Sequence, residues 1–129
     1  MNERNQKNKA IALYVGCEIY NAKTQQKDPN TPEELQMVVF RNDLGWHYIN
    51  TLSYDSNWSW LMPVYFRIAK ENGGLINSLG AINETSVCLA DLCDTGWAFT
   101  AENENPIDAI YKVVSEFCLD WCEENNEKI

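Results

Sequence analysis

The chain contains a single histidine, His47, so any reaction that needs an imidazole as general base must use this residue. His47 lies in the stretch GWHYIN, which has the composition of a strand, and no Ser or Cys nucleophile motif stands close to it in the sequence. A catalytic triad needs a nucleophile and a group that orients the histidine. Because the sequence identifies neither, we expect His47 to be structural or at the surface, and we assign no catalytic residue.

Cysteine thiolates are the second candidate for chemistry, as zinc ligands. The chain has five cysteines: Cys17, Cys88, Cys93, Cys118 and Cys122. Structural zinc sites usually contain a C-x2-C pair, and that spacing does not occur in this sequence. Cys88 and Cys93 would point to opposite faces of one strand, unless Cys93 has already entered the following turn. An odd number of cysteines without a secretory signal favours reduced thiols, and we predict no metal site.

Other motifs that hold ions or nucleotides are missing. The sequence contains no G-x-G-x-x-G, no Walker loop, no calcium-binding D-x-D-x-D-G loop and no H-E-x-x-H. We therefore expect no cofactor, and we expect a protein that is not an enzyme.

The charge balance restricts the partners. The chain has 19 acidic and 10 basic residues, a formal net charge of −9, and its field repels a phosphate backbone and an anionic lipid surface. We expect neither nucleic acid nor membrane as a partner. Since MNERNQKNKA lacks the apolar core of a signal peptide, and no apolar run reaches the roughly 20 residues that span a bilayer, we expect a cytoplasmic protein.

The elements that position these residues are expected to form one α+β domain over residues 1–129. LQMVVF, WHYINTL, LINSLGAI, TSVCLADL and GWAFTA have strand composition, and the close turn signals between the later runs are typical of an antiparallel meander. The first apolar segment, NKAIALYVGCEIY, fits a helix that ends at Gly16 or a strand. Residues 21–34 are polar, carry two prolines and are predicted to form a mobile loop.

Two helices are predicted from their caps and apolar spacing. The first follows DSN at residues 55–57 and contains Pro63, so it begins near Ser59 or bends at the proline. Its expected buried stripe is Trp58, Leu61, Tyr65 and Ile68, which leaves Trp60 and Phe66 off the stripe. The second helix begins at the Asn105-Pro106 cap and has its apolar stripe at Ile107, Ile110, Val114, Phe117 and Trp121.

Three blocks of the sequence resemble, in the same order and at similar distances, segments of small phage and prophage proteins: IALYVG, LSYDSNWSWLMPVYFRI and IDAIYKVVSEFCLDW. The chain resembles the phage ABA sandwich type, most specifically in W-x-W-L-M-P-V. The resemblance implies a helix/antiparallel sheet/helix sandwich of about four to five strands with a long C-terminal helix, in which IALYVG is a short helix. It implies no activity and no functional residues. The sequence departs from the family at Tyr65, Phe66 and Arg67, and in the loop 21–34.

Three functions are consistent with these observations. The first is a non-enzymatic accessory protein of a phage or mobile element, acting through protein contacts or self-association, with Trp60 and Phe66 as candidate contact residues. The second is a small-ligand binding protein or enzyme whose pocket is formed by Trp46, His47, Trp58 and Tyr65. The third is an acidic decoy that occupies a basic host protein.

Overall fold

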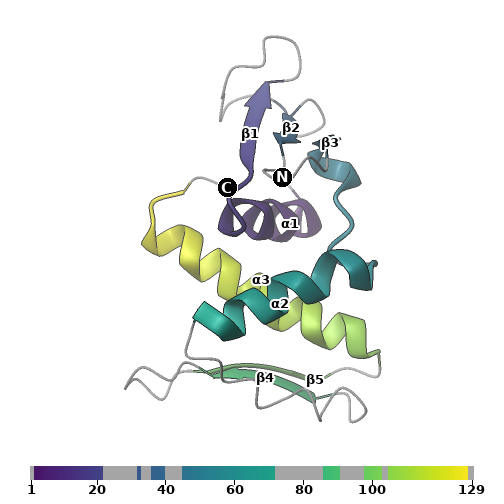
Figure 1. The fold of residues 1–129 in the computed structure, drawn as a ribbon, viewed down its shortest axis with the longest axis vertical. Coiled ribbons are helices and arrows are strands. Elements are labelled where there is room, and N and C mark those ends of the chain that lie inside the picture. The colour runs from purple at the N-terminus through teal and green to yellow at the C-terminus, as the bar shows by residue number, and fades with distance from the viewer. Residues whose placement is uncertain are drawn as a thin grey trace. The chain divides into compact units, whose positions relative to one another are not determined.

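The computed structural model describes residues 2–21, 32, 36–39, 45–71, 86–90, 98–102 and 105–127 (Figure 1). Within these ranges the chain forms helices α1 (Glu3–Tyr14), α2 (Trp58–Glu71) and α3 (Pro106–Glu124), a short 3₁₀ helix η2 (Ile49–Thr51), and strands β1 (Glu18–Asn21), β2 (Gln36–Val39), β3 (Trp46–Tyr48), β4 (Ser86–Ala90) and β5 (Ala98–Glu102). The expected α+β class is therefore confirmed. The predicted mobile loop 21–34 and the run LINSLGAI lie outside the described residues, apart from Asn21 and Pro32.

The chain divides into two compact units. Unit 1 comprises Met1–Ser53 and Cys118–Ile129, and unit 2 comprises Tyr54–Phe117, so that the boundary falls within α3. The strands follow the same division: β1, β2 and β3 form one antiparallel sheet, and β4 and β5 form another. The single domain expected over residues 1–129 stays a prediction.

The first apolar segment, which fits a helix or a strand by its sequence, contains both: α1 ends at Tyr14 and β1 begins at Glu18. The Asn2 side chain accepts a hydrogen bond of 2.7 Å from the Asn5 amide and caps the start of the helix. Gly16 adopts a φ of +91° and ends it, with the Cys17 amide donating to the Ala12 carbonyl at 2.9 Å. The chain then continues as β1.

Polar side chains of α1 are buried as well as apolar ones. Ala10, Ile11 and Ala12 are fully buried, and so is Asn8, while Lys9 is 4% exposed. Asn8 is satisfied because its side-chain amide donates to the Leu52 carbonyl at 3.1 Å, just after η2. Helix α1 is thus held to the end of the β3–η2 segment by polar contacts as well as by apolar packing.

The three-stranded sheet of unit 1 has β2 at its centre. Glu18 pairs with Val39 and Val39 with Trp46, while Tyr20 pairs with Met37 and Met37 with Tyr48. Directly opposed residues of an antiparallel sheet share a face. The register therefore separates two sets of residues, one on each face. Glu18, Tyr20, Trp46 and Tyr48 belong to the first face, and Ile19 and His47 belong to the second.

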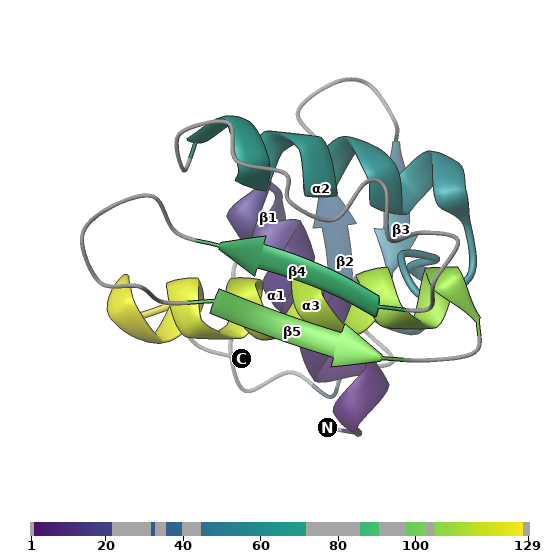
Figure 2. The same ribbon diagram turned by 90° about the horizontal axis from the view of Figure 1, so that it is seen from below.

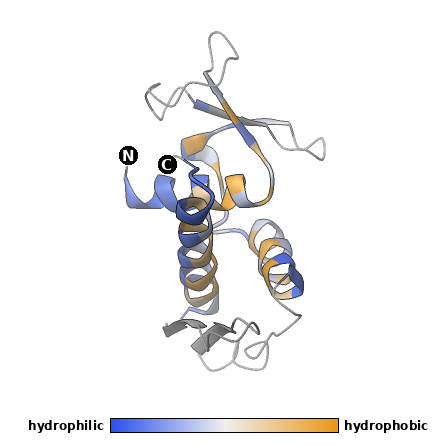
Figure 3. Ribbon diagram, turned by 90° about the vertical axis from the view of Figure 1, so that its left-hand side faces the viewer, coloured by the Kyte–Doolittle hydropathy of each residue, from blue (hydrophilic) through white to orange (hydrophobic). Residues whose placement is uncertain are grey.

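In unit 2, helix α2 has the predicted buried stripe with one exception. The Asn57 side chain accepts from the Ser59 amide at 2.8 Å, so the helix begins at Trp58, and Pro63 lies within it on the exposed side. Hydrophobic and hydrophilic residues lie on different sides of the helix (Figure 3). Its buried residues are Leu61, Val64, Tyr65, Ile68 and Ala69. Trp58 is 40% exposed, contrary to its expected place in the core.

The other elements of unit 2 are the β4–β5 hairpin and the first part of α3. The hairpin pairs Ser86 with Glu102 and Ala90 with Ala98 in antiparallel register (Figure 2). Helix α3 begins as predicted: the Asn105 side chain accepts from the Ile107 amide at 3.2 Å, and Pro106 is the first helical residue.

The buried residues of α3 occur at helical spacing along its whole length: Ile107, Ala109, Ile110, Val113, Val114, Ser115, Cys118 and Cys122. Phe117 and Trp121 are only half-buried. Trp121 packs edge-on against Tyr14 within unit 1, with ring centroids 5.4 Å apart. The helix ends with Asn126 at a φ of +57° and with the Glu127 amide donating to the Cys122 carbonyl at 2.8 Å.

Candidate functional site

His47 lies in the middle of β3 and is half-buried. By the sheet register it faces away from its neighbours Trp46 and Tyr48, on the side of the buried Ile19. In the part of the chain that the structure describes, no three His, Cys, Asp or Glu side chains are grouped so that they could hold a metal ion.

The described thiols of unit 1 lie in its buried interior. Cys17, Cys118 and Cys122 are buried thiols, and the Cys122 thiol donates to the Ala10 carbonyl over 3.7 Å. Burial raises the pKa of the Cys122 thiol to about 11; the charge of Glu127 acts in the same direction, and that of Lys9 opposes it. Since the thiolate is the reactive form, Cys122 is a poor nucleophile at neutral pH.

Large hydrophobic side chains are instead exposed at two places. In the described ranges these side chains are Trp46 (45% exposed) and Tyr48 (44%) on β3, and Trp58 (40%) and Phe66 (44%) on α2. Isolated exposed hydrophobic residues are common, but clusters of aromatic residues mark interaction surfaces. The two places belong to different units, β3 to unit 1 and α2 to unit 2.

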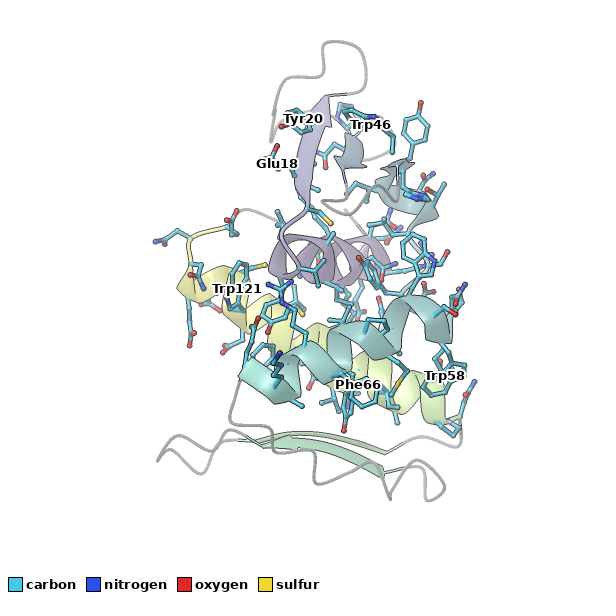
Figure 4. All side chains as sticks on the ribbon, viewed as in Figure 1. Glu18, Tyr20, Trp46, Trp58, Phe66 and Trp121 are labelled. Atoms are coloured by element: carbon cyan, nitrogen blue, oxygen red, sulfur yellow. The ribbon has the colours of Figure 1, made fainter. Side chains whose placement is uncertain are left out.

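The first place is the face of the three-stranded sheet formed by Glu18, Tyr20, Trp46 and Tyr48, which we call the aromatic sheet face. Tyr20 and Trp46 come from the two outer strands, and their ring centroids are 6.0 Å apart at an interplanar angle of 60°. The two rings therefore touch across the central strand without stacking. Figure 4 shows both rings and the Glu18 side chain around β1.

Glu18 and Tyr20 are two residues apart on β1, so they share the aromatic sheet face. The Tyr20 hydroxyl donates a hydrogen bond to the Glu18 carboxylate. This hydrogen bond raises the pKa of the Tyr20 phenol above its usual value, and the phenol stays neutral at physiological pH. The face thus combines three aromatic rings with one carboxylate that accepts a hydrogen bond from Tyr20.

The second place is the exposed edge of α2. Trp58, the half-buried Met62 and Phe66 follow one another at intervals of four residues, so they lie one above the other along the helix. The Phe66 ring packs edge-on against the buried Tyr65, with centroids 6.0 Å apart. Next to Phe66, Arg67 forms an ion pair of 2.9 Å with Glu71. Figure 4 labels Trp58 and Phe66 on this helix.

The two contact residues expected from the sequence differ in their surroundings. Phe66 is exposed, as expected for a residue off the buried stripe. Trp60 is half-buried because its ring packs edge-on against Tyr54, with centroids 5.2 Å apart, so a large part of its surface is already covered within unit 2.

The four residues of the alternative ligand pocket are not on common surfaces within their units. Trp46 and His47 point to opposite faces of the sheet. On α2, Trp58 is exposed whereas Tyr65 is only 1% exposed and belongs to the core. A pocket shared by all four residues stays a prediction.

Sequence reasoning missed Glu18, Tyr20 and Tyr48. The signal that could have found them is the alternation in EIYN and WHY, where aromatic or charged residues flank Ile19 and His47. Alternation alone does not show that two strands contribute to one face, since that depends on the register through β2.

None of the helices in the described ranges has the length and apolar character needed to cross a bilayer. Comparisons of the chain with protein-family models, with curated proteins and with solved structures find no match.

Proposed function

We propose that this chain is a non-enzymatic accessory protein of a phage or mobile element that acts through contacts with another protein. The observation that carries the proposal is the exposure of aromatic side chains on a regular sheet face, where Trp46 and Tyr48 each leave more than two fifths of their surface to solvent. Aromatic residues are enriched in protein interfaces and contribute most of the binding energy there.

The scaffold supports this role. Trp46 and Tyr48 lie on a strand that is paired with β2, and sites on regular elements are held more rigidly than sites on loops. The described cysteine thiols of unit 1 are buried, and Cys122 is kept protonated, so the observed geometry favours contact over nucleophilic chemistry.

The proposal also includes the location of the protein and its fold. We propose a cytoplasmic protein with the helix/antiparallel sheet/helix sandwich of the phage ABA sandwich type. The support for this origin is the sequence resemblance in W-x-W-L-M-P-V, which corresponds to residues 58–64 at the start of α2.

Site-specific photo-crosslinking tests the function. A benzoylphenylalanine is placed at Tyr48, at Phe66 and, as a control, at the exposed Lys112 of α3, and each variant is irradiated at low concentration in a bacterial lysate. We expect one crosslinked protein species at Tyr48 or Phe66 that is absent at Lys112. Light scattering of the purified chain separates a foreign partner from self-association. Equal crosslinking at all three positions, or none at any, would contradict the proposal.

A further inference from the structure

The aromatic sheet face carries the only carboxylate of its sheet. Of the eleven residues in β1, β2 and β3, which read EIYN, QMVV and WHY, only Glu18 is an Asp, Glu, Lys or Arg. The register puts Glu18 on the same face as Tyr20, Trp46 and Tyr48. Among the described residues, one carboxylate therefore shares this face with three aromatic side chains.

The faces of aromatic rings attract cations. A guanidinium or ammonium group is stabilised when it lies within about 6 Å of a ring centroid, and Trp is the most effective ring. The Trp46 ring is 45% exposed and tilted by 60° from Tyr20, so the two rings do not cover one another. The Tyr20 phenol donates a hydrogen bond to Glu18, so the carboxylate lies on the Tyr20 side of the Tyr20 and Trp46 ring pair.

We propose that the aromatic sheet face binds an arginine or lysine side chain from a basic segment of the partner protein. In this arrangement the Trp46 ring contacts the cation, Glu18 supplies the opposite charge, and Tyr20 and Tyr48 cover the aliphatic part of the side chain. The inference rests on the proposed function, because it specifies the chemistry of the partner that the function requires.

The negative charge of Glu18 and of the whole chain favours a cationic segment over the other ligands that stack on aromatic rings. Nucleic acid bases also stack on such platforms, but their phosphates are repelled by Glu18 and by the net charge of −9. A neutral sugar can donate hydrogen bonds to the carboxylate, but the field of the chain does not attract it. A basic segment is attracted by the field of the whole chain and by the carboxylate at the contact itself.

Nuclear magnetic resonance tests the inference on the intact chain. The indole N–H signal of Trp46 is followed while three probes are added: the blocked peptide GRGRGRG, its neutral counterpart GQGQGQG, and a short oligothymidylate. We expect the arginine peptide to shift the Trp46 signal in a saturable manner, and the other two probes to shift it little. Trp58, a similarly exposed tryptophan on α2, serves as the internal control signal.

Two substitutions identify the contact. Trp46→Ala and Glu18→Gln are each expected to weaken binding of the arginine peptide by about two- to fivefold, as for a cation at an exposed ring. Glu18→Gln keeps the size of the side chain, so it remains informative if Trp46→Ala alters the strand. Glu123→Gln removes an exposed carboxylate elsewhere in unit 1 and should change binding by less than about 1.5-fold.

The outcomes separate the inference from the proposed function. Equal binding of GRGRGRG and GQGQGQG, stronger binding of the oligothymidylate, or an equal effect of Glu123→Gln and Glu18→Gln would overturn the cationic assignment. If this happens while photo-crosslinking at Tyr48 still captures one protein, the proposed function stands and only the partner chemistry is wrong. If crosslinking also fails, both are wrong.

Discussion

The contact between α1 and the segment after η2 allows a sharp test of the structure. The carbonyl of the fully buried Leu52 accepts two hydrogen bonds from α1, one of 2.7 Å from the Arg4 guanidinium and one of 3.1 Å from the Asn8 amide. Arg4 also donates to the Asn50 carbonyl at 3.2 Å. Because the two donors share one acceptor, removing either of them leaves that acceptor satisfied by the other.

The expected magnitudes follow from this sharing. Arg4→Ala should lower the free energy of unfolding by about 1 kcal/mol, since the hydrogen bonds of an exposed guanidinium contribute at the low end of the range. Asn8→Ala should lower it by about 1 kcal/mol, after about 0.5 kcal/mol of better helix propensity is taken into account. The double variant leaves a buried carbonyl unsatisfied, and we expect it to lose at least about 1 kcal/mol more than the sum.

Urea unfolding of the wild type, the two single variants and the double variant, followed by circular dichroism, measures the free energy that the double variant loses beyond the sum of the two single losses. Lys7→Ala is the matched control on the same helix, because the half-buried Lys7 forms an ion pair of 2.8 Å with the exposed Glu3. Its effect should add to that of Asn8→Ala within about 0.5 kcal/mol. If the losses of unfolding free energy from Arg4→Ala and Asn8→Ala also add within that limit, the two side chains do not share the Leu52 carbonyl as acceptor. The contact that holds α1 in unit 1 would then be wrong as well.

Three further predictions concern other positions. Gly16→Ala should lower the free energy of unfolding by about 1 kcal/mol in urea, since Gly16 ends α1 at a φ of +91°. Gly45→Ala, at a φ of +83°, should cost a similar amount, because this backbone conformation is strained for any side chain; no loss at either position would contradict the positive φ angles. Burial raises the pKa of the Cys122 thiol from 9.0 to about 11, so its contribution to stability is complete below about pH 9 and is lost as the pH rises to about 11. Cys122→Ala should therefore flatten the decline of unfolding free energy over that window by up to about 1.4 kcal/mol per pH unit, and an unchanged slope would contradict the shift. Finally, Phe66→Ala should change the unfolding free energy by less than about 0.5 kcal/mol, whereas the adjacent Tyr65→Ala should lower it by about 3 kcal/mol or more, and comparable losses would mean that Phe66 is not at the surface.

Local chemistry made the helices of unit 2 predictable. Asn57 and Asn105 cap α2 and α3 through their own side chains, and the apolar spacing after each cap indicates which side is buried. Trp58 shows the limit of this reasoning, because it has the right spacing for the core but is the first residue of α2, where no preceding helical turn covers it.

The burial of polar residues in α1 could not be predicted from the sequence. Asn8 and Lys9 carry no local mark of burial, and the acceptor of Asn8, the Leu52 carbonyl, lies 44 residues further along the chain. The aromatic sheet face was missed for the same reason. Tyr20 and Trp46 come together only through the register of β1 with β2 and of β2 with β3, and no short stretch of the sequence contains this pairing.

The buried thiols of unit 1 can report local opening of the structure through the rate at which each is alkylated. Cys118 and Cys122 are fully buried, Cys17 is 6% exposed, and all three belong to unit 1. An alkylating reagent can reach such thiols only when the surrounding structure opens, so the labelling time of each one reports how often its neighbourhood does so. If α1 and the end of α3 open as one cooperative unit, Cys17 and Cys122 should be modified in step, and digestion with mass spectrometry would show this without adding any probe to the chain.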